Sequence, residues 1–259
     1  MLAVENLSIQ FPHRREMVQA VSDVSFAMAP GEILGIVGES GSGKTVTAHA
    51  ICGGLQGQRA VISGRSLFCG KDLLSASPHE KRQILGKRIS MVFQEPKSAM
   101  NPLMKVGRQV EEVLRIHTHQ TAKERKEAAL DAFRAVELSE PERVYAQYPH
   151  ELSGGMRQRA LIAGAILLGP ELLICDEPTT ALDVTTQAQI LALLQKINRD
   201  LGTGILFISH DLGVVRHLCQ RILVMKSGQV VEQGAVEQVF HDPQHAYTQK
   251  LLRASRGEI

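Results

Sequence analysis

The sequence feature that constrains the fold most is a glycine-rich stretch behind an apolar run. Residues 38–45 read GESGSGKT and directly follow EILGIV, residues 32–37. Three glycines in eight residues would destabilise a packed element, because glycine loses the most backbone freedom on folding. A helical pattern, TVTAHAICGGL, begins at residue 45. The order of strand, glycine loop and helix is the context that a phosphate-binding loop requires, so we expect an α/β chain with an anion site here.

The loop fits the pattern G-x-x-x-x-G-K-[ST]. Backbone N–H groups can surround a phosphate chain only where side chains stay out of the way, and the helix that follows directs its positive end at the anion. Lys44 is expected to reach the outer phosphates, and the Thr45 hydroxyl is expected to bind Mg²⁺. A glycine turn followed by a chance lysine is the alternative. The candidate nucleotide-binding residues are Gly38, Glu39, Ser40, Gly41, Ser42, Gly43, Lys44 and Thr45.

A second apolar run ends in two carboxylates. The segment LLICDEP places Asp176 and Glu177 directly after four apolar residues. Because Mg²⁺ prefers oxygen ligands, Asp176 is the candidate metal partner. Glu177 is the candidate general base toward a water that attacks the γ-phosphate, a role worth ~10²–10⁴ in rate. The alternative, an acidic surface turn, is disfavoured by the buried character of the preceding run.

Two further segments narrow the class of protein: a candidate anion-binding helix start and a histidine at the end of a strand. Ser153, Gly154 and Gly155, within ELSGGMRQR, stand just before a helical run, whose first turn could hold an anion. One phosphate loop needs only one binding site for the γ-phosphate. A second anion-binding site in the same chain is therefore useful only where two copies pair head to tail. His210 ends the strand pattern FIS, where a lone histidine is usually structural.

The chain of 259 residues divides by pattern into one α/β domain with a helical insertion. We expect a catalytic core over residues 1–96 and 152–234, a helical subdomain over 97–151 and a helical tail over 235–259. A hairpin is expected about Ser227-Gly228, and a helix that stops at Gly202. Two helical faces are expected: Val106, Val110, Val113 and Leu114 on one helix, and Ile190, Leu194, Ile197 and Leu201 on another.

Composition excludes several classes of protein. The 29 basic and 27 acidic residues nearly balance, which argues against a nucleic-acid partner. The four cysteines are far apart, so metal or disulfide spacing is absent. No apolar run reaches the ~18 residues of a membrane span, and the first residues lack the layout of a signal peptide. We therefore expect a water-soluble protein of the cell interior.

Together these segments resemble the nucleotide-binding subunit of an ATP-binding cassette transporter. GESGSGKT is similar to the Walker A loop, LLICDE to the Walker B strand and LSGGM to the family signature. ALDV, residues 181–184, resembles the D-loop, Gln94 in MVFQEP the Q-loop and His210 the switch histidine. Phe11 resembles the aromatic residue that stacks on adenine, although a strand-end phenylalanine is often only core.

The resemblance implies a P-loop NTPase fold: a RecA-like α/β core, an antiparallel β subdomain and an inserted α-helical subdomain. It also implies an ATPase that uses ATP and Mg²⁺. Thr45, Gln94 and Asp176 would bind the metal, Glu177 would be the base, and His210 would hold the γ-phosphate. Gln94 would also contact the attacking water. Ser153, Gly154 and Gly155 would complete the ATP site of a partner cassette, and ATP would close the dimer.

A finer resemblance concerns the oligopeptide, dipeptide and nickel importer branch. FQEPKSAMNPL, YPHELSGGMRQR, DEPTTALDVTTQAQIL and DPQHAYTQKLL are similar to that branch. It implies a subunit that powers uptake of peptides, nickel or a metal chelate. Its partners would be a second ATP-binding subunit, which in that branch is usually a different, sister ATPase, together with two transmembrane permeases touched by the helical insertion and an extracytoplasmic substrate-binding protein. The chain would lie peripherally on the cytoplasmic face of the membrane, bound only through partners.

Two expectations distinguish this chain from neighbouring classes. Longer peptide-importer ATPases carry a cysteine-bearing extension for an iron–sulfur cluster; this sequence lacks that cysteine set, so we expect no cluster.

The rival function is a cassette ATPase that acts on nucleic acid or the ribosome. Such proteins hold two cassettes or a long coiled coil, and neither pattern is present. No guanine-reading Asn-Lys-x-Asp stretch supports a GTPase, and a small-molecule kinase would not explain LSGGM.

Overall fold

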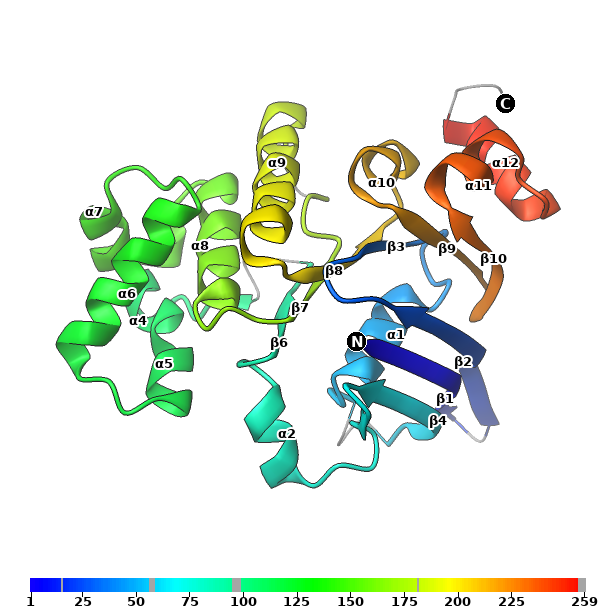
Figure 1. Cartoon of the computed structure of the whole chain (residues 1–259), viewed down its shortest axis with the longest axis horizontal. Coiled ribbons are helices and arrows are strands. Elements are labelled where there is room, and N and C mark those ends of the chain that lie inside the picture. Colours follow the sequence, from blue (N-terminus) through cyan, green and yellow to red (C-terminus); the bar gives the residue numbers. More distant parts are fainter. Residues whose placement is uncertain (15, 56–58, 95–98, 181, 256–259) are drawn as a thin grey trace. The chain divides into compact units, whose positions relative to one another are not determined.

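The structure is a computed structural model of the chain, and it describes every residue except 15, 56–58, 95–98, 181 and 256–259 (Figure 1). The chain forms two compact units. The first comprises Met1–Lys81 and Gly204–Ile259, and the second comprises Arg82–Thr203. The expected boundary between residues 96 and 97 lies outside the described residues.

The first unit contains an antiparallel sheet built from the start of the chain. Its strands are β1 (Leu2–His13), β2 (Glu16–Met28), β4 (Val61–Phe68) and β5 (Lys71–Asp72), in the order β2-β1-β4-β5. Apolar residues of β1 recur at every second position and are buried, interrupted by an irregular register near Glu5 and Asn6. The alternation expected of a half-buried strand therefore forms this sheet.

The same unit contains a run of mostly parallel strands: β3 (Ile33–Val37), β8 (Gly204–Ser209), β9 (Arg221–Lys226) and β10 (Gln229–Ala235). β3 lies between β8 and β9, parallel to both, and all five of its residues are buried. β9 and β10 form the expected hairpin, whose turn residues Ser227 and Gly228 have φ of 48° and 82°. Two consecutive positive φ values are typical of the tight turns that join such strands.

The helices of the first unit are α1 (Lys44–Ile51), α10 (Leu212–Leu218), α11 (Val236–His241) and α12 (Ala246–Ser255). α2 (Pro78–Ile84) includes the point where the chain leaves this unit. The tail after Ala235 is helical, as expected, and is divided into α11 and α12. None of the four cysteines, all of which lie in the described part of the chain, forms a disulfide bond.

The second unit combines two parallel strands with a group of helices (Figure 1). The strands are β6 (Ile89–Val92) and β7 (Leu172–Asp176), and every residue of β7 is buried. The helices are α4 (Val106–Val110), α5 (Glu112–His117), α6 (Ala122–Ala135), α7 (Pro141–Ala146), the short 3₁₀ turn η1 (Pro149–Glu151), α8 (Gly154–Ile166) and α9 (Val184–Leu201). α8 packs against α4 and α6. No helix in the described part of the chain is both long and apolar enough to cross a membrane.

Two expectations about helical faces need correction. The single helix expected through Leu114 is two helices, because at Glu111 the backbone tightens and the Leu114 N–H donates to the Glu111 carbonyl, three residues back. Val113 is only half-buried. α9 ends at the left-handed Gly202 as expected, but Leu201, its last residue, is 54% exposed, while Leu193 takes a buried position.

Gly107 provides a test of the packing between α4 and α7. A Cβ atom built on Gly107 would lie 2.0–2.4 Å from ring atoms of Tyr145, whose hydroxyl donates to the buried Glu111 carboxylate at 2.9 Å. We expect Gly107→Ala to lower the free energy of unfolding by about 1–3 kcal/mol, because overpacking a close contact displaces the ring. Chemical denaturation measures the change.

The matched control is Gly164→Ala in α8. An added Cβ there would lie 3.6 Å from Val110 Cα, an ordinary contact. Because alanine favours a helix interior by about 1 kcal/mol over glycine, this variant should be neutral or stabilised. Equal stability of Gly107→Ala and Gly164→Ala would contradict the assignment.

Candidate nucleotide-binding and catalytic residues

The glycine loop spans residues 38–43 and joins β3 directly to α1. α1 begins at Lys44, and Gly43 occupies the position before it with φ of 100°. Gly41 also has a left-handed backbone, with φ of 79°. These conformations favour glycine, and they bring the loop backbone around the start of α1. The strand–loop–helix order expected from the sequence is therefore present.

Two of the glycines are required by close approach as well. A Cβ on Gly38 would lie 2.2 Å from the Met225 carbonyl oxygen, and one on Gly43 would lie 2.7 Å from the Ala20 carbonyl oxygen. The loop is also tied to the β9–β10 turn, because the Gly228 N–H donates to the Ser42 carbonyl at 2.9 Å. The loop is thus held tightly by neighbouring backbone of the same unit.

The side chains of the loop provide donors that suit an anion. Lys44 is 4% exposed, and its Nζ donates to the carbonyls of Gly38 and Glu39 at 2.8 and 3.0 Å. The Ser42 hydroxyl is buried and has no hydrogen-bond partner among the described residues. A buried ammonium, an unsatisfied hydroxyl and a helix N-terminus together match the chemistry of a phosphate chain.

His210 follows the strand next to the one that carries the loop. Val37, the last residue of β3, pairs with Ser209, the last residue of β8. Because parallel strands share one carboxyl edge, His210 and Gly38 leave the sheet at the same edge. His210 is exposed, and the following Asp211 caps α10 by accepting the N–H groups of Gly213 and Val214.

Phe11 lies near the end of β1 and is half-buried. It pairs with Val18 of β2, two residues before Ala20, whose carbonyl approaches the loop at Gly43. A phenylalanine at this position is partly available for stacking. Its contact with adenine remains a prediction.

The acidic pair stands at the end of β7 in the second unit. Asp176 is 2% exposed and Glu177 is 8% exposed. Val92 of β6 pairs with Cys175 of β7, so the segment that carries Gln94 leaves at the same edge. The Gln94 amide Nε2 donates to Glu177 Oε2 at 3.0 Å. The structure therefore brings together two residues that are 83 positions apart in the chain.

The Glu177 carboxylate has a second donor that sequence reasoning missed. The Thr180 hydroxyl donates to the same oxygen, Oε2, at 2.9 Å. The only signal in the sequence is the threonine pair that follows Asp-Glu-Pro. Glu177 also has φ of 45°, a left-handed conformation that is costly for a residue with a side chain. Two donors and an unusual backbone fix the orientation of this carboxylate.

The signature residues form the start of α8. Ser153 is the N-cap, and its hydroxyl accepts the Met156 N–H at 3.2 Å. Gly154 and Gly155 lie in the first turn of the helix, whereas the sequence pattern placed them just before it. A Cβ on Gly155 would lie 2.6 Å from Thr186 Cγ2 of α9, so glycine permits the two helices to approach closely. A cavity of about 320 Å³ opens beside Ser153, Gly155, Met156, Arg159, Thr186 and Gln189.

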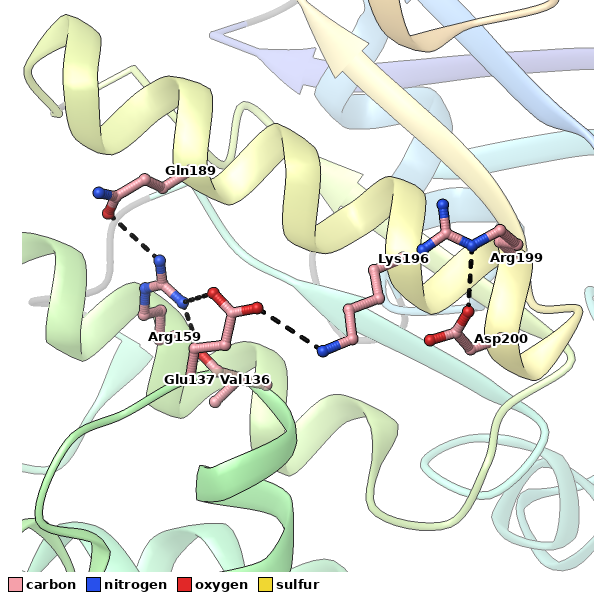
Figure 2. A network of polar contacts seen from close by, with 7 residues as sticks. All are labelled: Val136, Glu137, Arg159, Gln189, Lys196, Arg199 and Asp200. Carbon is pink, nitrogen blue, oxygen red and sulfur yellow. Dashed lines mark hydrogen bonds and ion pairs between the residues drawn. The ribbon is translucent and has the colours of Figure 1, made fainter.

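A buried arginine holds the signature helix against its neighbours (Figure 2). Arg159 Nη1 donates to the Val136 carbonyl at the end of α6, at 2.5 Å, and Nη2 donates to the Gln189 side chain of α9, at 3.2 Å. Glu137 bridges the same guanidinium, at 3.4 Å, and Lys196, at 3.6 Å. One side chain thus fixes the position of α8 relative to α6 and α9.

Ala181, the first residue of the expected D-loop, lies outside the described residues. Asp183 of the same segment caps α9, because its side chain accepts the Thr186 N–H at 2.9 Å.

The described residues contain no group of three or more His, Cys, Asp or Glu side chains that could hold a metal ion. Mg²⁺ does not need such a group, because it usually takes one or two protein oxygens together with phosphate oxygens and water. The Asp176 carboxylate and the Thr45 hydroxyl are each an oxygen ligand of the kind that Mg²⁺ takes.

Comparison with known proteins places the chain in a family. The family model described as "ABC transporter" matches residues 21–180. A probable peptide ABC transporter ATP-binding protein, y4tR, of Sinorhizobium fredii is 47% identical over 98% of this chain and 76% of its own length. The oligopeptide transport ATP-binding protein OppD of Bacillus subtilis is 47% identical over 97% of this chain and 71% of its own length.

Two further comparisons agree. The peptidoglycan transport ATP-binding protein YejF of Agrobacterium fabrum is 49% identical over 100% of this chain, which spans 48% of that longer protein. The dimeric structure of MJ0796, a bacterial ABC transporter cassette, superposes with a TM-score of 0.81 at 29% identity and covers 91% of this chain and 99% of its own. The P-loop NTPase fold expected from the sequence is therefore confirmed. The chain belongs to the ABC transporter family and is one of its ATP-binding, ATP-hydrolysing cassettes.

Proposed function

We propose that this chain is the ATPase subunit of an importer that takes up peptides. The observation that carries the cargo class is the similarity to peptide and oligopeptide transport ATP-binding proteins over 97–98% of the chain. Nickel or a metal chelate, the other cargo of the branch that the sequence resembles, is the competing cargo. The rival role on nucleic acid or the ribosome has no support among these relatives.

We propose that the phosphate loop and the acidic pair act on the same ATP. The amides of residues 38–45 and the Lys44 ammonium would bind the phosphates, with Phe11 against adenine. Thr45, Gln94 and Asp176 would hold Mg²⁺, which when bound neutralises charge on the phosphates. Glu177 would take the proton of the attacking water as the bond between the γ-phosphorus and the bridging oxygen breaks. His210 would hold the γ-phosphate.

We propose that two cassettes pair head to tail. Ser153, Gly154 and Gly155 would then face the ATP of the partner cassette, and the cavity beside the start of α8 leaves room for part of that ligand. The network about Arg159 supports this role, because it fixes the first turns of α8 before any partner binds. ATP binding would close the pair and hydrolysis would reopen it.

Ser153→Arg tests the head-to-tail arrangement. The variant should damage the partner's site and leave its own phosphate loop intact. When Ser153→Arg chains are mixed with Lys44→Ala chains, mixed pairs contain one site with both defects and one intact site. ATPase activity should therefore reappear on mixing, although each variant alone is inactive. If mixed pairs form and the mixture is as inactive as its components, each signature serves its own chain's site.

The remaining partners follow from the family and are proposals. They are a second ATP-binding subunit, two transmembrane permeases and an extracytoplasmic binding protein. The chain would reach the cytoplasmic face of the membrane only through the permeases. Fractionation provides a first check, because a transporter subunit should be recovered with membranes that contain its permeases, and recovery on ribosomes would support the rival role.

The test of the proposed function is ATP turnover by the assembled complex in the presence of its binding protein. Peptide-loaded binding protein should stimulate turnover above the level seen with unloaded binding protein. Nickel or a nickel chelate in place of peptide is the matched comparison. Stimulation by the metal species alone would overturn the peptide assignment and leave the ATPase assignment standing.

A further inference from the structure

We propose that Tyr247 of α12 is a positioning residue of the nucleotide site, whose hydroxyl fixes the peptide unit that orients Lys44. This proposal rests on the proposed role of the phosphate loop and assigns a part in it to the C-terminal helix. Tyr247 lies within DPQHAYTQKLL, the segment similar to the importer branch, but no pattern in the sequence assigns it a role. It lies 208 positions from its contact in the loop.

The contact acts on one peptide unit of the loop. The Glu39 N–H donates to the Tyr247 hydroxyl oxygen at 3.2 Å. The carbonyl of that same peptide unit belongs to Gly38, and it accepts a hydrogen bond from Lys44 Nζ at 2.8 Å. In a planar trans peptide the N–H and C=O point in opposite directions, so holding one end sets the direction of the other. Tyr247 thereby turns the Gly38 carbonyl toward Lys44.

The next peptide unit is linked to the same arrangement. The Glu39 carbonyl accepts both the Ser42 N–H, at 3.1 Å, and Lys44 Nζ, at 3.0 Å. Rotation of the Gly38–Glu39 peptide would therefore disturb both carbonyls that hold the ammonium. Because Gly38 has no side chain, little else in the residue itself resists that rotation. A hydrogen bond from outside the loop is well placed to restrain it.

Tyr247 is itself held firmly in the first unit. It is 6% exposed, and the Lys226 ammonium lies 5.0 Å from the centre of its ring. The Glu232 carboxylate of β10 accepts the N–H groups of Gln244 and His245, which fixes the start of α12. Burial raises the pKa of Tyr247, so its hydroxyl remains protonated at neutral pH. A rigid, neutral hydroxyl is thus presented to the loop.

Tyr247→Phe removes the hydroxyl and keeps the ring. A single hydrogen bond of this kind corresponds to about a three- to tenfold change in an equilibrium constant. We therefore expect the dissociation constant for a non-hydrolysable ATP analogue with Mg²⁺, measured by calorimetry, to rise by that factor. KM for ATP should rise in parallel, and kcat at saturating ATP should stay near the wild-type value. The matched control is Lys250→Ala, an exposed position on the same helix.

A second measurement reports on the contact directly. The exchange rate of the Glu39 amide hydrogen, followed by nuclear magnetic resonance, should increase in Tyr247→Phe and not in Lys250→Ala. A merely structural role would lower the unfolding midpoint without nucleotide and leave the dissociation constant of the folded protein unchanged. That result, or unchanged exchange at Glu39, would overturn the proposal.

Nucleotide binding by the wild-type chain distinguishes failure of the proposed phosphate loop from failure of the Tyr247 contact. If the wild-type chain does not bind the ATP analogue, the proposed role of the phosphate loop is wrong. If the wild type binds and Tyr247→Phe binds equally well, the loop assignment stands and the positioning role of Tyr247 is wrong.

Discussion

Glu177→Gln should stop ATP hydrolysis while ATP binding persists. The substitution keeps the shape of the side chain and removes its capacity to take a proton from water. Loss of a general base lowers a rate by ~10²–10⁴, so turnover should fall by at least about a hundredfold. Because binding without hydrolysis favours the closed pair, the variant should form a stable dimer with ATP. Phosphate release and size-exclusion chromatography with ATP measure the two effects.

The control for this prediction makes the same chemical change nearby. Glu171 precedes β7, is exposed, and forms a surface pair with Arg88. Ion pairs on the surface contribute only about 0–1 kcal/mol to the stability of the fold, so the Glu171→Gln variant should hydrolyse ATP normally. Full turnover in Glu177→Gln would remove Glu177 from the role of base. Loss of turnover in both variants would point to a general loss of folded protein.

Lys44→Ala should abolish productive ATP binding. Lys44 is buried at the start of α1, with its ammonium on the loop carbonyls, and would bring its charge to the outer phosphates. Hydrogen bonds to charged groups contribute about 1.5–3 kcal/mol each. Loss of two such bonds between the Lys44 ammonium and the phosphates would therefore weaken ATP binding by about a hundredfold or more. Calorimetry with the ATP analogue measures the change.

Lys71→Ala is the control for Lys44→Ala. Lys71 is a partly exposed lysine of the same unit, in an ion pair with Glu80 at 2.8 Å. Its replacement should leave the dissociation constant unchanged. An unchanged ATP affinity in Lys44→Ala would mean that the nucleotide binds elsewhere on the chain.

The sequence predicted those parts of the site that depend on local pattern. The glycine loop is recognisable because its special backbone requires glycine at Gly41 and Gly43, and because a buried strand precedes it. Asp176 and Glu177 are recognisable because two carboxylates that follow a buried apolar run stand at the carboxyl end of the strand. The capped helix after Ser153 also followed from its own residues. In each case the residues that form the pattern lie within about ten positions of one another in the chain.

The contacts that the sequence did not reveal join distant residues. Tyr247 meets Glu39, Gln94 meets Glu177, and Arg159 meets the end of α6, all through packing that no local period encodes. Gln94 is recognisable in the sequence only through a family resemblance. The break between α4 and α5 has the same origin, because the buried Glu111 is held by Tyr145 of α7. These features depend on tertiary structure, and they supply much of the orientation within the site.

We propose that the loop amides and Lys44 bind a triphosphate that Glu177 helps to hydrolyse. The most direct measurement is a crystal structure of Glu177→Gln grown with ATP and Mg²⁺. We predict phosphates within hydrogen-bond distance of the amides of residues 38–45, with Lys44 Nζ on the outer phosphates and the residue 177 side chain facing the γ-phosphate. Nucleotide bound away from this loop, or a residue 177 side chain directed away from the γ-phosphate, would contradict the account.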